Sequence, residues 1–176
     1  MPFRSAFVVI LTVLFFTGCA STLTSDIEVE TETAPRVNLN GYKTYAWLGS
    51  AQIVYDPEGQ WEPPAFDADA EIRRMINAAL RDKGFIEVAS GPDVLVGFAA
   101  GIDMEALEIR EHPEEKLQTL ENVPRGALVI MLVDPATRHP VWVGEALAKV
   151  QKKISAEDVK KRLQYAVDRM FGQMER

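Results

Sequence analysis

Two histidines and two aspartates are the residues of this chain best suited to acid–base or metal chemistry. His112 and His139 are each followed by proline in predicted loops, and neither has a second histidine three or four positions away, which excludes a helical metal-binding pair. Asp93 and Asp134 flank apolar segments. Paired at a cleft they could transfer protons or hold a hard cation, but an aspartate at such a boundary ordinarily accepts hydrogen bonds from turn amides.

Motifs for nucleophilic or nucleotide chemistry are missing from the sequence. The chain contains neither Gly-x-Ser-x-Gly nor a glycine-rich loop that ends in Gly-Lys-Ser/Thr. The acidic runs around His112 read most simply as a solvated face, with weak divalent-cation binding as the alternative. We therefore predict no catalytic residue, no metal site and no cofactor.

Three tryptophans are the candidates for ligand or partner contact. Trp47 and Trp142 lie in predicted strands, where they either form an aromatic floor for a ligand or pack in the core. Trp61 lies in a proline-rich segment, where an exposed ring would indicate contact with a partner or with lipid head groups.

The N-terminal segment has the pattern of a signal peptide. Arg4 carries its only side-chain charge, and residues 6–16 form an uncharged apolar run of eleven residues. A membrane-spanning helix needs about 20 apolar residues, so this run is too short for a permanent span.

The only cysteine follows this run directly. Thr17 and Gly18 precede Cys19, which resembles a bacterial lipobox, with Phe16 where leucine is usual. The resemblance implies that residues 1–18 are removed and that Cys19 becomes the lipidated first residue. Two or more acyl chains would hold the protein stably on a membrane. The alternative for a lone cysteine is a buried thiol that packs as a small apolar side chain.

Length and charge limit the remaining functions. Removing residues 1–18 of the 176 leaves 158, enough for one domain with a core, which we expect over residues 27–176 after a lipidated N-terminus and tether at 19–26. The formal charge of −7 becomes −8 when Arg4 is lost. Such a balance argues against nucleic acid as a partner and offers no basic patch for anionic lipids. Acylation of Cys19 would also leave no thiol for a disulfide.

Two amphipathic helices are indicated. Residues 67–85 have Asp67 or Asp69 as the N-cap, Gly84 as the stop, and apolar residues at helical spacing. Residues 155–173 begin with Ser155 three residues before Asp158, a capping-box pattern. The predicted apolar stripes are Ile72, Met75, Ile76, Ala79 and Leu80 in the first helix, and Val159, Leu163, Ala166, Val167, Met170 and Phe171 in the second.

Alternating or apolar segments predict the strands. They cover residues 42–49, 85–88, 91–102, 126–134 and 140–150, and residues 26–33 read either as a strand or as an acidic tether. Residues 50–65 are expected to be a loop, and the acidic residues 103–122 a helical or irregular insertion. The order predicts an α+β two-layer sandwich, with a mostly antiparallel sheet and two helices on one face.

Four short motifs resemble a family of bacterial envelope lipoproteins known as the domain of unknown function 4136. They are YKTYAW at 42–47, L..KGF at 80–85, PDVLV at 92–96 and VWVGEA at 141–146. The resemblance implies a lipid-anchored α+β domain with no established activity. Ala20 and Ser21 follow the cysteine where aspartate would favour the inner membrane, so the resemblance implies the inner leaflet of the outer membrane, facing the periplasm.

The sequence thus predicts a non-catalytic envelope lipoprotein that serves as an interaction or assembly module. Its expected partners are the membrane, through the N-terminal lipid, and an envelope protein. The alternative is a periplasmic carrier for a small ligand or lipid, with a pocket between helices and sheet near Trp47 and Trp142.

Overall fold

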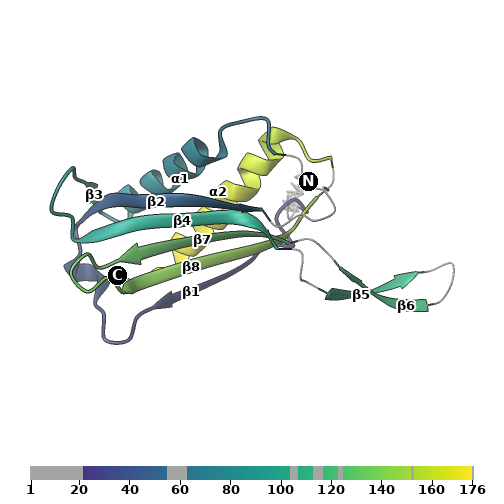
Figure 1. The fold of residues 1–176 in the computed structure, drawn as a ribbon, viewed down its shortest axis with the longest axis horizontal. Helices are drawn as coiled ribbons and strands as arrows, with labels where there is room; N and C mark the ends of the chain where they lie inside the picture. The colour runs from purple at the N-terminus through teal and green to yellow at the C-terminus, as the bar shows by residue number, and fades with distance from the viewer. Residues whose placement is uncertain are drawn as a thin grey trace, which may run out of the picture.

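A six-stranded mixed sheet forms the centre of the molecule (Figure 1). The computed structural model describes residues 22–54, 63–103, 107–112, 117–122, 125–151 and 153–175. In spatial order the strands are β1 (Glu28–Thr33), β8 (Pro140–Lys149), β7 (Arg125–Val133), β4 (Val94–Asp103), β2 (Thr44–Val54) and β3 (Ile86–Glu87). Pairing is antiparallel from β1 to β4 and parallel from β4 through β2 to β3. The predicted α+β fold with a mostly antiparallel sheet is confirmed.

Both helices lie on one side of this sheet (Figure 1). Helix α1 spans Ala68–Asp82 and helix α2 spans Ala156–Gln173. The predicted caps are present: Asp67 Oδ1 accepts a hydrogen bond from the Ala70 amide at 3.0 Å, and Ser155 Oγ accepts one from the Asp158 amide at 3.1 Å. These bonds satisfy amides that the helices cannot pair internally, and so fix where each helix begins.

The core fills the space between the two layers. Helix α1 buries all five residues of its predicted stripe, and α2 buries Ala166, Val167, Met170 and Phe171. They pack on the alternate residues of the central strands that face the helices: Val94, Val96, Phe98, Leu128, Ile130 and Leu132. The period of two along each strand decides which face is buried.

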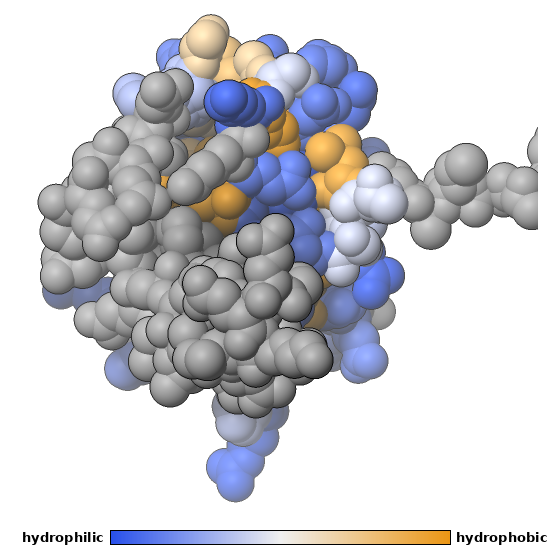
Figure 2. Space-filling model, turned by 90° about the vertical axis from the view of Figure 1, so that its right-hand side faces the viewer, coloured by the Kyte–Doolittle hydropathy of each residue, from blue (hydrophilic) through white to orange (hydrophobic). Residues whose placement is uncertain are grey.

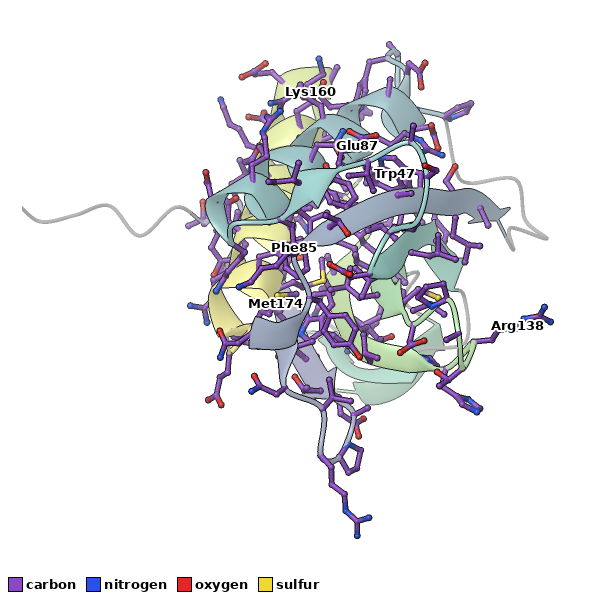
Figure 3. All side chains as sticks on the ribbon, turned by 90° about the vertical axis from the view of Figure 1, so that its left-hand side faces the viewer. Trp47, Phe85, Glu87, Arg138, Lys160 and Met174 are labelled. Atoms are coloured by element: carbon purple, nitrogen blue, oxygen red, sulfur yellow. The ribbon has the colours of Figure 1, made fainter. Side chains whose placement is uncertain are left out.

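One end of the sandwich is closed by apolar side chains from outside the sheet. Leu39 belongs to the short helix η1 (Leu39–Gly41) on the connection between β1 and β2, and it joins Phe85 and Met174 in the core. Lys83 Nζ donates a hydrogen bond to the Met174 carbonyl at 2.8 Å, which ties the end of α1 to the end of α2. Figure 3 looks onto this closed end and shows Phe85 and Met174 there.

Two sequence predictions are wrong. Within the acidic segment 103–122, the described residues form strands where a helix or irregular structure was predicted: β5 (Leu107–His112) and β6 (Leu117–Asn122) pair as an antiparallel two-stranded sheet that projects from the main sheet (Figure 1). His112 therefore ends a strand instead of lying in a loop. Strand β2 also continues to Val54, into the segment predicted as a loop, because it pairs with β4 as far as Ile102.

Gly144 supplies a test of how tightly the core is packed. A Cβ at this position would lie 2.6 Å from Trp142 Cη2 and 3.0 Å from Met170 Sδ. Trp142 has little room to move, because it is 1 % exposed and its ring centroid lies 5.2 Å from that of Phe171. We expect Gly144→Ala to lower the free energy of unfolding by about 1–3 kcal/mol, measured by urea denaturation.

Gly172 is the matched control for this substitution. It lies in α2, and an added Cβ would have no atom within 4 Å, so alanine there should raise stability by roughly 0.5 kcal/mol. Equal stability of the two alanine variants would show that the core beneath Trp142 yields more easily than this packing implies.

Candidate functional site

The side of the sheet opposite the helices is apolar and has no helix or strand of the described residues lying on it (Figure 1). We call this surface the open face. Its central side chains alternate with those of the core, and Leu48 is 58 % exposed there. The members of the open face are Leu48, Leu95, Gly97, Ala99, Ala127, Val129, Met131, Val133, Val143 and Leu147.

Gly97 is a buried glycine in the middle of the open face. A Cβ at this glycine would lie 3.7 Å from Leu48 Cδ2 and 3.7 Å from Met131 Cγ, so the two large side chains stand on either side of it. Val129 and Val143 extend the apolar surface along β7 and β8. Leu48 is exposed and its large apolar neighbours are half-buried, and a group of apolar side chains at the surface can mark an interaction site.

Carboxylates border the open face along its β1 edge. Glu28, Glu30 and Glu32 project from β1, and Glu30 lies directly opposite Glu145 of β8. Like charges that face each other across strands are unfavourable in an isolated sheet. Glu28 approaches the Arg125 guanidinium at 3.5 Å, an ion pair exposed enough to contribute little. The open face is thus an apolar surface with an acidic edge.

A pocket opens between helices and sheet at the end opposite to the closed one. Its volume is about 650 Å³. It lies between the first turns of both helices and the end of the sheet formed by the last residues of β4 and β8 and the first residues of β7. Small side chains create the room: Ala100, Ala146 and Ala148 stand on the strands where larger residues would fill the space. Figure 2 looks toward this end, where hydrophobic residues are visible among hydrophilic ones.

Arg162 holds one wall of this pocket in place. Its guanidinium is bound to both carboxylate oxygens of Asp26 at 2.7 Å, donates to the Leu23 carbonyl, and reaches the Lys149 carbonyl at 3.3 Å. The hydrogen bonds from Arg162 hold the pKa of Asp26 below its ordinary value of 3.8, against the opposing effect of burial. Arg162 therefore fastens the segment before β1 to helix α2 and to the end of β8.

Trp47 and Trp142 both face the helices but do not form one floor. Trp47 pairs with Val96, Val96 with Leu132, and Leu132 with Trp142, so strands β4 and β7 lie between the two tryptophans. Three strand spacings separate their backbones by roughly 14 Å. Trp142 is a core residue, and its indole N–H has no hydrogen-bond partner among the described residues. Trp47 is half-buried under the Arg73 guanidinium, 4.4 Å from its ring centroid. Neither lines the pocket, whose first core-facing residues on β4 and β8, Ala100 and Ala146, lie four residues further along each strand.

The two candidate aspartates are engaged by backbone amides. Asp93 Oδ2 accepts hydrogen bonds from the amides of Lys43 and Thr44, both at 2.8 Å. Asp134 Oδ1 accepts from the amides of Ala136 at 2.7 Å and Thr137 at 2.9 Å. These bonds lower the pKa of each carboxyl group below 3.8.

Both aspartates lie at the closed end. Asp93 comes just before β4 and Asp134 just after β7, and these two strand ends are adjacent because Leu95 pairs with Val133. The Tyr42 hydroxyl group interacts with Asp134. The pKa of Tyr42 is raised, chiefly because burial disfavours the charged form and secondly because the Asp134 carboxylate repels it. His139 is an exposed residue of the same turn as Asp134. Within the residues that the structure describes, no group of three or more His, Cys, Asp or Glu side chains could hold a metal ion.

Two predicted site residues lie outside the described residues: Cys19 and Trp61. Over the described part of the chain, no helix combines the length and apolar character needed to cross a bilayer.

Comparison with known proteins identifies the fold. The family model described as "Domain of unknown function (DUF4136)" matches residues 29–174. A search of curated proteins found no match. A DUF4136 family protein from Bacteroides thetaiotaomicron is 11% identical, with a TM-score of 0.55, and the match covers 84% of this chain and 95% of that one.

Two other solved structures match over most of this chain. A PDZ domain protein from Parabacteroides distasonis is 13% identical with a TM-score of 0.50, over 89% of this chain and 38% of that one. The PelC dodecamer from Paraburkholderia phytofirmans is 11% identical with a TM-score of 0.49, over 85% of this chain and 99% of that one.

Proposed function

This chain belongs to the DUF4136 family, and on that premise we propose that it is a lipid-anchored envelope lipoprotein whose domain is a non-catalytic interaction module. The N-terminal pattern supports the anchor, because an apolar run too short to span a bilayer leads through Thr17 and Gly18 to the only cysteine. Ala20 and Ser21 after the cysteine favour the inner leaflet of the outer membrane, with the domain in the periplasm.

The open face carries the proposal for the interaction. In a two-layer fold, the face of an antiparallel sheet that points away from the helices usually carries polar residues. Here the helices cover only one face, and the other carries the exposed Leu48 and the half-buried Val129, Met131 and Val143. The proposed occupant is a protein surface with an apolar centre and a basic border, because carboxylates line the β1 edge.

The absence of chemistry is part of the same proposal. Asp93 and Asp134 each accept two backbone hydrogen bonds at 2.7–2.9 Å, which keeps them ionised and occupied in turns. A general acid or base would need a pKa nearer to neutrality. The lowered pKa values of both groups therefore favour a structural role for them.

Site-specific photocrosslinking in the native envelope tests the open face. A photoreactive amino acid at Val129 or Met131 should capture the same partner, and one at Arg169 on the exposed side of α2 should not. In the protein with the photoreactive amino acid in place of Met131, adding Glu30→Lys and Glu32→Lys together should reduce that crosslink at least fivefold. The two lysines would place positive charge against the basic border of the partner.

Glu175→Lys is the charge control, since this exposed residue follows helix α2 at the closed end. It should leave the crosslink unchanged. Equal capture from Arg169 and Met131, or equal loss with Glu175→Lys, would contradict an interaction through the open face.

A further inference from the structure

We infer that the pocket between the first turns of the helices and the sheet is a binding site for a single acyl chain that ends in an anionic group. This ligand site lies on the helix side of the sheet and shares only Ala127 with the open face, at the end of the sheet. It does not depend on lipidation of Cys19. The occupant is a carboxylate or phosphate amphiphile, such as a fatty acid.

The size and lining of the pocket suit an apolar chain. Its volume of about 650 Å³ falls within the roughly 300–1,000 Å³ of small-molecule sites. The inner walls come from Ile72 of α1, Leu128 of β7 and Ala166 of α2, all at most 5 % exposed. No hydrogen-bonding side chain lies among these three, so the deep part of the pocket favours hydrocarbon.

The small residues show why the space stays open. Ala100 lies on β4, in the middle of the sheet and on the face that the helices cover, yet it is only half-buried. Ala148 on β8 is half-buried in the same way. Two residues from Ala100 toward the closed end, the large side chains of Phe98 and its pairing partner Ile130 fill the space between sheet and helices. The core is therefore less completely filled at this end, although Ile102 beyond Ala100 is still buried.

The polar groups around the mouth point to a negative head group. The described lining residues include Lys149, Lys153 and Arg162 but no aspartate or glutamate, in a chain with 26 acidic residues. Asp26 neutralises Arg162 from outside the lining. Lys153 is exposed beside Gln151 at the rim, which places positive charge where the head group of an inserted chain would emerge.

The direction of insertion follows from this polarity. Apolar residues lie deep and the lysines lie at the rim, so the hydrocarbon end enters first and the anionic end stays at the surface. A neutral chain of equal length would gain the apolar contacts but not the attraction to Lys153.

Photoaffinity labelling tests this site in full-length protein reconstituted in phosphatidylcholine vesicles. A photoreactive palmitate analogue should label peptides that contain Leu128, Ala146 or Ala166, and unlabelled palmitate should compete. Hexadecanol, which lacks the charge, should compete at least fivefold less well. A lysophosphatidate arm distinguishes a preference for phosphate from one for carboxylate.

Pocket variants make the result specific. Ala100→Phe and Ala148→Phe should each reduce labelling at least tenfold by filling the pocket, while a thermal melt near or above that of wild type verifies that the fold is intact. Lys153→Glu should weaken competition by palmitate about fivefold. Lys43→Glu, the same change on an exposed residue at the closed end, should not alter it.

Labelling that is spread over the surface, or that survives both phenylalanine variants in folded protein, would overturn the pocket as the site. Equal competition by hexadecanol and palmitate, together with no effect of Lys153→Glu, would overturn its anionic preference.

Discussion

Replacing Arg162 with methionine should lower the free energy of unfolding by about 3 kcal/mol at neutral pH. The Arg162 side chain is 10 % exposed and that of Asp26 is 17 % exposed, so the substitution leaves a largely buried carboxylate without its guanidinium. It also removes the donors to the Leu23 and Lys149 carbonyls. Equilibrium denaturation in urea measures the loss.

Acid should remove the same stabilisation from the wild-type protein. The folded-state pKa of Asp26 is depressed below 3.8, so the ion pair stabilises the fold fully above that value. As the pH falls through the lower folded-state pKa, Asp26 takes up a proton and the contribution is lost. The stability difference between wild type and Arg162→Met should therefore narrow below about pH 4.

Arg169→Met is the control, because Arg169 is an exposed arginine on the same helix. It should change stability by no more than about 0.5 kcal/mol. Adding Asp26→Asn to Arg162→Met should restore part of the loss, because the unpaired charge is then gone. Similar losses for both arginine variants, or no recovery with Asp26→Asn, would show that the buried ion pair does not hold this segment.

Replacing Cys19 with alanine should abolish acylation of the protein. The proposed anchor depends on this thiol, since no other cysteine is present in the sequence. Growth with labelled palmitate should mark the wild type and leave Cys19→Ala without label. The variant should also keep residues 1–18 and migrate as a larger protein, because the resemblance to a lipobox places cleavage directly before the modified cysteine.

Ser21→Ala tests whether the effect is specific to the thiol. This change lies two residues after the cysteine and should leave both the label and the cleavage unaffected. Palmitate label that persists in Cys19→Ala would place the acyl group elsewhere and remove the basis for the anchor.

The helices could be predicted closely because local signals and tertiary packing agree there. Asp67 and Ser155 cap them as expected, and the stripe from Ile72 to Leu80 is buried in full. Consistency between local preference and the final fold is what makes such segments predictable. The burial of alternate residues Leu128, Ile130 and Leu132 is seen only in the structure, because residues 127–133 are all apolar and their sequence does not indicate which face is buried.

The hairpin shows where composition misled. Glutamate favours helices, and the acidic content of residues 103–122 suggested one. Yet Leu107 and Ile109 alternate with charged residues, the period of a strand, and Ile109 pairs with Leu120. The alternation of apolar and charged residues was therefore a better predictor of secondary structure here than the acidic composition. The end of β2 was missed because its pairing partner, β4, lies far along the chain.

The candidate sites depend on strand order, which local sequence patterns do not specify. The open face exists because both helices lie on the other side, and the pocket exists because small residues on three strands meet at one end. Two signals could have pointed to them. Arg162 interrupts the apolar stripe between Val159 and Ala166, and Ala146 and Ala148 are small at positions that face the core.

The most direct test of a lipid-anchored envelope protein is the intact mass of the wild-type chain purified from its host membranes. A lipid-anchored protein should yield a chain that begins at Cys19, with residues 1–18 absent and the added mass of a diacylglyceryl group and its acyl chains confined to that residue. An unmodified N-terminus, with the leader intact or cleaved at another position, would contradict it.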